Sequence, residues 1–430
     1  MQHRQECACA RSCLCHRTER GVTTIQLLVI LVPVLFGFIG FAVDLGQMYL
    51  IRGELKTAAS SMALAAAQKL IGTDQGIADA SAAAQLAIDT SSGVGNRYNF
   101  GELAIGQANG FLSSNAPDPG YFATLQDALS GSDSSGGGAT SRHARVTITA
   151  DAPLTFWRFL PGGAEGKVPV AVQAVAGISA PLCTACGIEN FAIAALDQSD
   201  TTDFGFVADT KYTLGYTCNG NPVPSGLQGA PPRLQYLLLN RLNTAATVLA
   251  DENSQLFRIG ANGLPGNTDS TQACFMINTA ETIWAAAAPV ACAVNRVAPT
   301  VTSAVCGLTS RFEASPPTAC QTIPDIGTLS GIYNPDTDVS SIDTYSTYAG
   351  SGRRVITIPI VDTLNATGSM TVLGFRQFLV EPNLNGVDVD PADTDGRFIV
   401  LYIGSVVPVK QGRFDGCQIT AGPGKVVLHQ

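Results

Sequence analysis

A long uncharged and mainly apolar run extends from Val22 to Val43, after Arg17 and Arg20 and before Asp44. At 1.5 Å per residue, a helix over this run is about 33 Å long, which matches the hydrocarbon core of a bilayer. The run therefore predicts a single transmembrane helix over residues 22–43. The arginines before it place residues 1–21, here called the leader, in the cytoplasm by the positive-inside rule.

A cleaved secretory signal is the alternative interpretation of this run. Such a signal has an apolar region of about 7–15 residues that ends at a small-x-small cleavage site. The sequence FAVDLGQMYL, where the run ends, offers no such site. The length and the missing site favour a helix that is retained as an anchor.

The helical pattern continues beyond Asp44. Residues 48–70 are built from strong helix formers, without a proline and with a single glycine, Gly53. Apolar residues recur at steps of three and four, which forms one stripe along a helix: Met48, Ile51, Leu55, Ala58, Met62 and Ala65. The sequence predicts one rod from the membrane to about Leu70, with a kink at Pro33.

A helix followed by two alternating strands is predicted next. Residues 73–90 form a second Ala-rich helical pattern, and residues 91–141 are rich in Gly, Ser, Asn and Asp. Residues 146–150 and 168–176 alternate apolar and other side chains, as half-buried strands do. The turn between them contains Phe156, Trp157 and Phe159. We expect these rings to pack in the core, with a partner-binding patch as the alternative.

Residues 181–430 are predicted to form a separate ectodomain. Helical patterns cover Arg233 to Glu252 and Asn278 to Cys292, the latter with Glu281 three residues after a potential N-cap. Residues 353–362, 369–380 and 396–409 are strand patterns, the last two nearly continuous in apolar residues. The fold class is α+β: a cytoplasmic leader (1–21), a transmembrane helix (22–43), a helical and two-stranded periplasmic region (44–180) and an α+β ectodomain with a strand-rich C-terminal part (181–430).

The composition excludes several classes of function. The formal net charge is −9, and the leader carries more Arg than acidic residues, so the body is acidic and disfavours nucleic-acid binding. Four histidines, His3, His16, His143 and His429, are too few and too scattered for His-based catalysis or multi-histidine zinc sites. The chain lacks the Walker A, G-x-S-x-G and H-E-x-x-H motifs. We expect no enzymatic activity.

The cysteines outside the leader predict structural disulfides. All eight lie beyond Ala180: Cys183, Cys186, Cys218, Cys274, Cys292, Cys306, Cys320 and Cys417. They indicate up to four disulfides and an oxidising compartment, and eight cysteines allow 105 pairings. The CTAC motif of Cys183 and Cys186 has the spacing of a redox pair or half a zinc site, but no second C-x-x-C accompanies it. Structural disulfides are favoured.

The N-terminal segment resembles TadE/TadG-like proteins of the Flp (Tad) pilus-assembly system. That family has an Arg-Gly start, an apolar run with a proline, an A-V-D-x-G exit and an Ala-rich helix. Asp44 and Gly46 match the exit, and Ser60 stands where the family usually has Asp. The helix matches at Leu55, Ala58, Ala59, Ala63, Leu64, Ala65, Ala66 and Ala67. Residues 143–178 resemble, more weakly, a second strand-turn-strand element of that family.

The resemblance raises the question of prepilin-type cleavage, since the family is related to pilins. Prepilin peptidases cut after a glycine, and the fifth residue beyond is usually Glu. Here Gly21 is followed at that position by Gln26. Gln cannot form the charge pair that a pilin Glu makes, so an uncut anchor is favoured over processing at Gly21.

Two acidic segments are candidate cation sites. One is the segment VDVDPADTDG, in which four carboxylates could offer oxygen ligands to Ca²⁺: Asp388, Asp390, Asp393 and Asp395. It departs from an EF-hand, because Pro391 interrupts the spacing and no bidentate Glu closes the loop. A charged loop is therefore favoured. Asp197, Ser199 and Thr201 resemble the start of the von Willebrand A Mg²⁺ site that some TadG-like proteins carry. A solvated turn is favoured there too.

Taken together, these features predict a structural component of a Tad-like pilus or related secretion apparatus. It would be a single-pass protein of the bacterial inner membrane, with its ectodomain periplasmic or surface-exposed. Its partners would be other assembly proteins or pilin subunits. It would need no cofactor, with Ca²⁺ as the one candidate ligand. The alternative is a processed minor pilin with an adhesive or Ca²⁺-binding tip domain.

Overall fold

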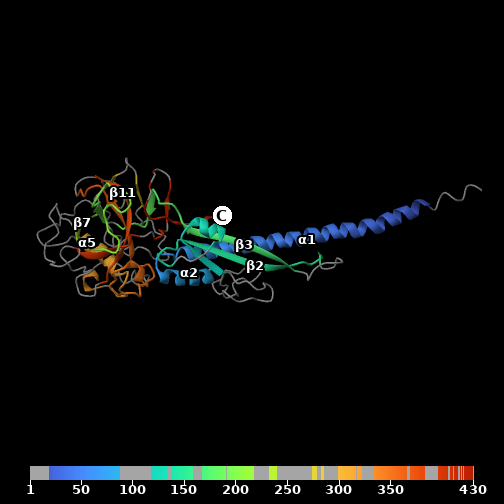
Figure 1. Cartoon of the computed structure of the whole chain (residues 1–430), viewed down its shortest axis with the longest axis horizontal. Helices are drawn as coiled ribbons and strands as arrows, with labels where there is room; N and C mark the ends of the chain where they lie inside the picture. Colours follow the sequence, from blue (N-terminus) through green and yellow to red (C-terminus); the bar gives the residue numbers. More distant parts are fainter. Residues whose placement is uncertain are drawn as a thin grey trace, which may run out of the picture.

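The computed structural model of the chain describes most of it. The described residues are 19–87, 118–132, 137–157, 167–189, 191–216, 232–239, 274–277, 282–284, 299–315, 317–321, 334–365, 369–382, 396–404, 407–409, 411–414, 417, 419 and 421–429. A long helix projects from one end of an elongated molecule, a first sheet lies along that helix, and a second, strand-rich region lies at the far end (Figure 1).

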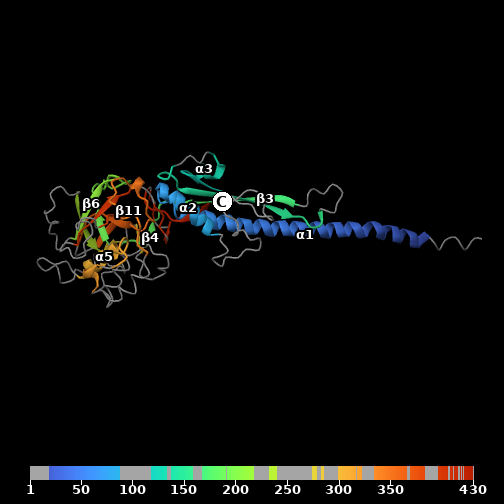
Figure 2. The ribbon, with the colours of Figure 1, turned by 90° about the horizontal axis from the view of Figure 1, so that it is seen from below.

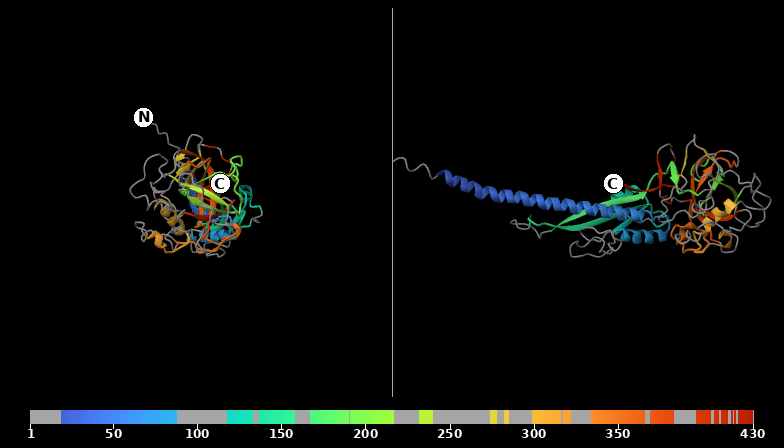
Figure 3. Two further views of the ribbon diagram at one scale, coloured as in Figure 1. Left: turned by 90° about the vertical axis from the view of Figure 1, so that its left-hand side faces the viewer. Right: turned by 180° about the vertical axis from the view of Figure 1, so that it is seen from behind.

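The predicted rod is confirmed as α1, Glu19–Ala67, a helix of 49 residues that is continuous through Pro33. Its two halves differ in what covers them. From residue 24 to residue 45 almost every side chain is exposed, whereas Ile51, Leu55 and Met62 of the predicted stripe are fully buried. The stripe therefore packs against the body, and the apolar half before it projects beyond the body (Figure 3).

The second predicted helix is confirmed as α2, Asp74–Leu86, which packs against α1. Its N-cap is Thr73, whose hydroxyl accepts a hydrogen bond from the Gly76 N–H at 3.1 Å. Ala80 and Ala84 are completely buried. The small side chains on this face let α2 lie close to α1.

The predicted pair of strands forms the centre of the first sheet. Its order is β1 (Asp118–Phe122), β2 (His143–Pro153), β3 (Lys167–Ile178) and β14 (Val426–His429), all antiparallel. The face toward α1 carries alternate small apolar residues: Ala144, Val146, Ile148, Ala150 and Ala152 from β2, with Val172, Ala174 and Ala176 from β3. The short helix α3 (Leu125–Ser130) covers the opposite face at Val175 (Figure 2).

The second region is built around a closed ring of six strands. The ring order is β10 (Val355–Val361), β5 (Phe191–Ala194), β7 (Arg233–Leu238), β6 (Lys211–Tyr216), β12 (Phe398–Tyr402) and β11 (Ser369–Val380). Pairing of β10 with β11 closes it, and β9 (Thr282–Trp284) adds to β11 outside the ring. The β5–β10 and β6–β7 pairs are parallel and the others antiparallel.

Alternate residues of all six ring strands form one hydrophobic cluster. Aromatic rings dominate it, as in the T-shaped contact of Phe191 with Tyr236 at 5.1 Å between centroids. Helix α5 (Pro299–Thr309) contributes Ala304, Val305 and Leu308. A separate three-stranded sheet has the order β13 (Gln411–Arg413), β4 (Thr184–Cys186) and β8 (Cys274–Met276). The second region also contains two short 3-10 helices, η4 (Thr318–Cys320) and η5 (Tyr345–Thr347).

Two sequence predictions were wrong in this region. The expected helix from Arg233 to Glu252 begins instead with strand β7, and the expected helix from Asn278 to Cys292 contains strand β9. The remaining residues of both segments lie almost entirely outside the described parts of the chain. In β7 the alternate residues Tyr236 and Leu238 enter the ring core, so pairing with β5 and β6 overrides the local helix propensity.

The C-terminal strand returns to the first sheet. Val426–His429 belong to the range expected for the ectodomain, yet they pair with β3. Nearby, the Ser179 N–H donates to the Lys425 carbonyl and the Leu182 N–H donates to the Pro423 carbonyl. Two antiparallel segments therefore connect the two regions, and Figure 1 shows the C-terminus beside β3.

Candidate functional site

The most conspicuous surface of the described molecule is the first half of α1, an apolar helix with little covering it. Residues Thr24–Ala67 include the one helix in the described part of the chain that is long and apolar enough to cross a membrane. Phe36 and Phe38 are 67% and 69% exposed. An uncovered apolar surface of this extent indicates contact with lipid or with other helices.

Asp44 marks the point where this surface meets the body. Its carboxylate is buried and accepts hydrogen bonds from three consecutive backbone N–H groups: Thr155 at 2.8 Å, Phe156 at 3.0 and 3.2 Å, and Trp157 at 2.8 Å. These three residues, Thr155, Phe156 and Trp157, are here called the hairpin tip; they follow β2 with Leu154 between them. Asp44 thus satisfies three backbone donors of another element, and a carboxylate acceptor makes such hydrogen bonds stronger.

Gly40 lies one helical turn before Asp44 and allows the hairpin tip to approach the helix. A Cβ at this position would lie 2.8 Å from the Cβ of Phe156 and 2.9 Å from its Cγ. On the neighbouring surface, the rings of Phe41 and Trp157 are 6.3 Å apart between centroids. The helix therefore holds the hairpin tip through one glycine, one carboxylate and one aromatic contact.

The expectation that the aromatic turn packs in the core was wrong for its described residues. Phe156 and Trp157 are each 44% exposed, and Phe159 lies outside the described residues. The turn lies at the end of the β2–β3 hairpin, where α1 covers only one side of it. Sequence reasoning identified Asp44 as the end of the apolar run but missed Gly40 and the partners of Asp44, because those partners lie 111 to 113 residues away.

The disulfide prediction is confirmed for the described pairs, Cys183–Cys417 and Cys306–Cys320. Cys186 is also disulfide-bonded. Because Cys183 is bonded to Cys417, the CTAC motif does not form a C-x-x-C disulfide. Cys274 lies in β8, while Cys218 and Cys292 lie outside the described residues.

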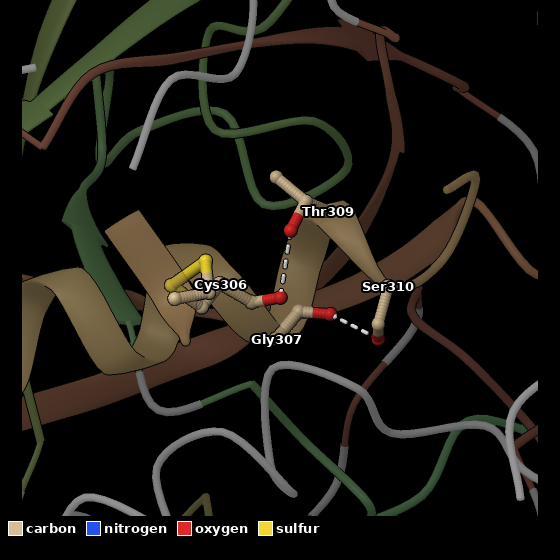
Figure 4. Close-up of a disulfide and its surroundings, with 5 residues drawn as sticks. Cys306, Gly307, Thr309 and Ser310 are labelled. Carbon is tan, nitrogen blue, oxygen red and sulfur yellow. Dashed lines mark hydrogen bonds between the residues drawn. A yellow bond between two sulfur atoms is a disulfide. The ribbon is translucent and has the colours of Figure 1, made fainter. Parts of the chain in front are cut away.

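The Cys306–Cys320 disulfide fixes the end of α5. Figure 4 shows Cys306 with the last turn of the helix, where the Thr309 hydroxyl donates to the Cys306 carbonyl and the Ser310 hydroxyl to the Gly307 carbonyl. These bonds satisfy carbonyls that a helix end leaves without partners. The disulfide and the turn together have a structural role in the second region.

The segment at Asp197 forms a turn that is closed by its own N–H groups. Asp197 accepts from the N–H and hydroxyl of Ser199, and Asp200 accepts from the N–H groups of Thr202, Asp203 and Gly205. These hydrogen bonds lower the pKa of both carboxyl groups. Among the described residues, no cluster of three or more His, Cys, Asp or Glu has the geometry to hold a metal.

The other predicted site residues remain predictions. Asp388, Asp390, Asp393 and Asp395 lie outside the described residues, so the calcium site stays a prediction. Gly21 lies within α1, and Gln26 is exposed on its apolar half. An uncut N-terminus at Gly21 stays a prediction.

A cavity of about 390 Å³ lies where the first sheet meets the second region, lined in part by Arg142, His143, Arg376 and Tyr402. Its guanidinium groups already donate to backbone carbonyls, Arg142 to Ser141 and Arg376 to Phe375, Thr201 and Thr202. Each of these arginines is therefore engaged within its own region, Arg142 in the first and Arg376 in the second. The candidate functional site is consequently the first half of α1 together with the hairpin tip.

Comparison with protein families agrees with this location. Residues 21–69 match the family model described as "Putative Flp pilus-assembly TadE/G-like". Residues 21–69 are thus a TadE/G-like segment. This TadE/G-like segment contains the exposed half of α1, Gly40 and Asp44, and it ends before the hairpin tip and the second region. No curated protein and no solved structure matches the chain.

Proposed function

We propose that this protein is a structural component of a Tad-like (Flp) pilus or related secretion apparatus, anchored in the bacterial inner membrane by the first half of α1. The observation that supports this most directly is the TadE/G-like segment, whose exposed apolar half ends where Asp44 joins the body. The role is assembly through contacts, and it includes no catalytic step.

The proposed orientation has the leader in the cytoplasm and the body in the periplasm. The leader carries Arg4, Arg11, Arg17 and Arg20, and positive charge is retained on the cytoplasmic side. The disulfides of the second region support an oxidising compartment on the other side.

The proposed contacts are between α1 and helices of partner subunits. At the membrane boundary, Ala42 and Gly46 are exposed and four residues apart, on either side of the end of the uncharged run at Val43, and an added Cβ at Gly46 would meet no atom within 4 Å. Pairs of small residues at this spacing let helix backbones approach closely in membranes. Gly40, in contrast, is already covered by the hairpin tip, so partners would bind the other faces of α1.

Site-specific photocrosslinking in cells that express the whole apparatus tests this proposal. A photoreactive residue at Phe38, which is 69% exposed, should form adducts with other pilus-assembly subunits. The same residue at Leu55, which is completely buried and already carries a large side chain, is the matched control and should form none. A Phe38 probe that reacts with no assembly subunit, in cells where the pilus is made, would contradict the proposed role.

The alternative, a processed minor pilin with an adhesive or Ca²⁺-binding tip domain, is favoured by one feature of the fold. The second region lies at the end of the molecule opposite the exposed half of α1, as a tip domain would (Figure 1). N-terminal sequencing of the protein from cells separates the two proposals. A first residue at Val22 supports the minor pilin, and an intact leader excludes it.

A further inference from the structure

The hairpin tip overlaps the membrane-spanning part of α1 instead of stopping before it. Phe156 contacts Gly40, and Trp157 lies beside Phe41. Both helix residues belong to the uncharged run that ends at Val43. Since a helix rises 1.5 Å per residue, Gly40 lies about 6 Å on the membrane side of Asp44. A bilayer that covers α1 up to Val43 would therefore also reach the hairpin tip.

The chemistry of the hairpin tip suits this position. Its three N–H groups are satisfied by Asp44, which removes the main cost of placing an irregular backbone close to lipid. Its outward surface includes the half-exposed rings of Phe156 and Trp157. Tryptophan is enriched where membrane meets water, because its ring is apolar and its N–H can still reach water.

The buried carboxylate of Asp44 fits the same arrangement. An ionised carboxylate at a membrane boundary is costly unless it is hydrogen-bonded. Asp44 is 3% exposed and is paired with the hairpin tip rather than with solvent. The helix and the hairpin thus satisfy each other's polar groups at the level where both leave the membrane.

We propose that the hairpin tip is a second membrane contact, with Phe156 and Trp157 in the headgroup and upper acyl region of the leaflet that faces the body. This inference rests on the proposed function, in which α1 spans the membrane. Two contacts with one leaflet fix the depth of α1 and its rotation about its axis. They also reserve the Gly40–Asp44 face of α1 for the hairpin and leave the other faces for partners.

Tryptophan fluorescence in liposomes tests the proposal, because the chain has two tryptophans, Trp157 and Trp284. In the full chain with Trp284→Phe, Trp157 is the single reporter. Reconstituted into phosphatidylcholine vesicles, it should be quenched by lipids brominated near the headgroup, and less by lipids brominated near the chain end. The Trp157→Phe variant, which keeps Trp284 in β9 of the second region, is the control and should show no quenching by either lipid.

A third protein separates failure of this inference from failure of the proposed function. Phe36→Trp in a background of Trp157→Phe and Trp284→Phe places the reporter on the first half of α1, where the side chain is 67% exposed. If this α1 reporter is quenched and Trp157 is not, α1 spans the bilayer and the hairpin-tip inference is wrong. If neither is quenched, both proposals are wrong. A blue-shifted Trp157 that brominated lipid does not quench would show that protein, and not lipid, covers the ring and would also overturn the inference.

Two variants of α1 connect the quenching to the described geometry. Gly40→Leu should displace Phe156 and reduce the quenching of Trp157, because no Cβ fits between helix and hairpin. Gly37→Leu, where an added Cβ would meet nothing within 4 Å, is the matched control and should leave the quenching unchanged. Equal quenching in both variants would show that α1 does not position the hairpin tip.

Discussion

The two regions of the molecule are stabilised by different side chains. Where α1 meets the first sheet, the contact consists largely of alanines: Ala59, Ala63, Ala66 and Ala67 from the helix face Ala144, Ala150, Ala174 and Ala176 from the strands. The second region instead fills its ring with aromatic and branched side chains and adds disulfides. Between residues 21 and 180 the chain has no cysteine.

The regions also differ in buried charge. In the second region Arg311 forms an ion pair with Glu189, and Arg354 forms one with Glu381, although all four side chains are almost completely buried. Along the described contact of α1 with the first sheet, the buried carboxylate is Asp44, which accepts hydrogen bonds from backbone N–H groups. Small side chains let a helix and a sheet approach closely, whereas the second region combines large core side chains with cross-links and paired charges.

The largest expected effect is on the cross-links of the second region. Cys183→Ala with Cys417→Ala opens a loop with a sequence separation of 234, and Cys306→Ala with Cys320→Ala opens one of 14. In the chain-entropy account the first pair should lower the free energy of unfolding by roughly 5 kcal/mol and the second by roughly 3 kcal/mol. Urea unfolding of the full chain in detergent, followed by circular dichroism, measures both. Equal losses would contradict the loop-length ranking.

Breaking a buried ion pair should cost somewhat less than opening the longer disulfide loop. Glu381→Gln leaves Arg354 charged and buried, where its Nη2 lies 3.1 Å from the Glu381 carboxylate, so the variant should lose about 4 kcal/mol of unfolding free energy. The control is Asp343→Asn, because Asp343 pairs with Lys211 at 3.0 Å but its side chain is 95% exposed. The control should match the wild type in the same urea titration.

The contact of α1 with the first sheet should be sensitive to added volume. Ala63→Leu inserts methyl groups into a completely buried site and should destabilise the protein by about 2 kcal/mol through overpacking. Ser61→Leu, two residues earlier on the exposed face of the same helix, is the control and should be nearly neutral. If both variants unfold at the wild-type urea concentration, the alanine contact is looser than described.

The smallest expected effect is a dependence on pH at the returning C-terminus. His143 of β2 and His429 of β14 lie on either side of β3, with ring centroids 5.5 Å apart. Burial lowers the pKa of His143, as do the nearby His429 and Arg142, while a hydrogen bond with the Ala123 backbone acts in the opposite direction. Burial also lowers the pKa of His429.

A folded-state pKa below the unfolded value means that the unfolded chain binds more protons. The contribution of this pair to stability is therefore complete above about pH 6.5 and is lost as the pH falls through the lower folded-state pKa. Unfolding of the wild type at pH values above and below this point should show the loss. His429→Gln should reduce it, and an unchanged pH dependence in that variant would exclude the pair as its source.

Much of the first region could be predicted from the sequence because its elements are encoded locally. The run at 22–43, the stripe from Met48 to Ala65 and the alternation in β2 and β3 are periodic patterns within single elements. The same reasoning failed at Arg233–Leu238 and Thr282–Trp284, where strands replaced expected helices. There the neighbouring strands decide the structure, and their identity is not written in the segment itself.

By itself, the sequence determined that the chain carries one long helix with an apolar first half, two strands joined by a turn, and a disulfide-bonded region rich in strands. Only the tertiary structure decided that the ring closes through β10 and β11, that the last strand returns to β3, and that Asp44 holds the hairpin tip against Gly40. The physical reason is distance along the chain. Periodicity and propensity act over a few residues, whereas the three N–H groups that satisfy Asp44 come from more than a hundred residues away.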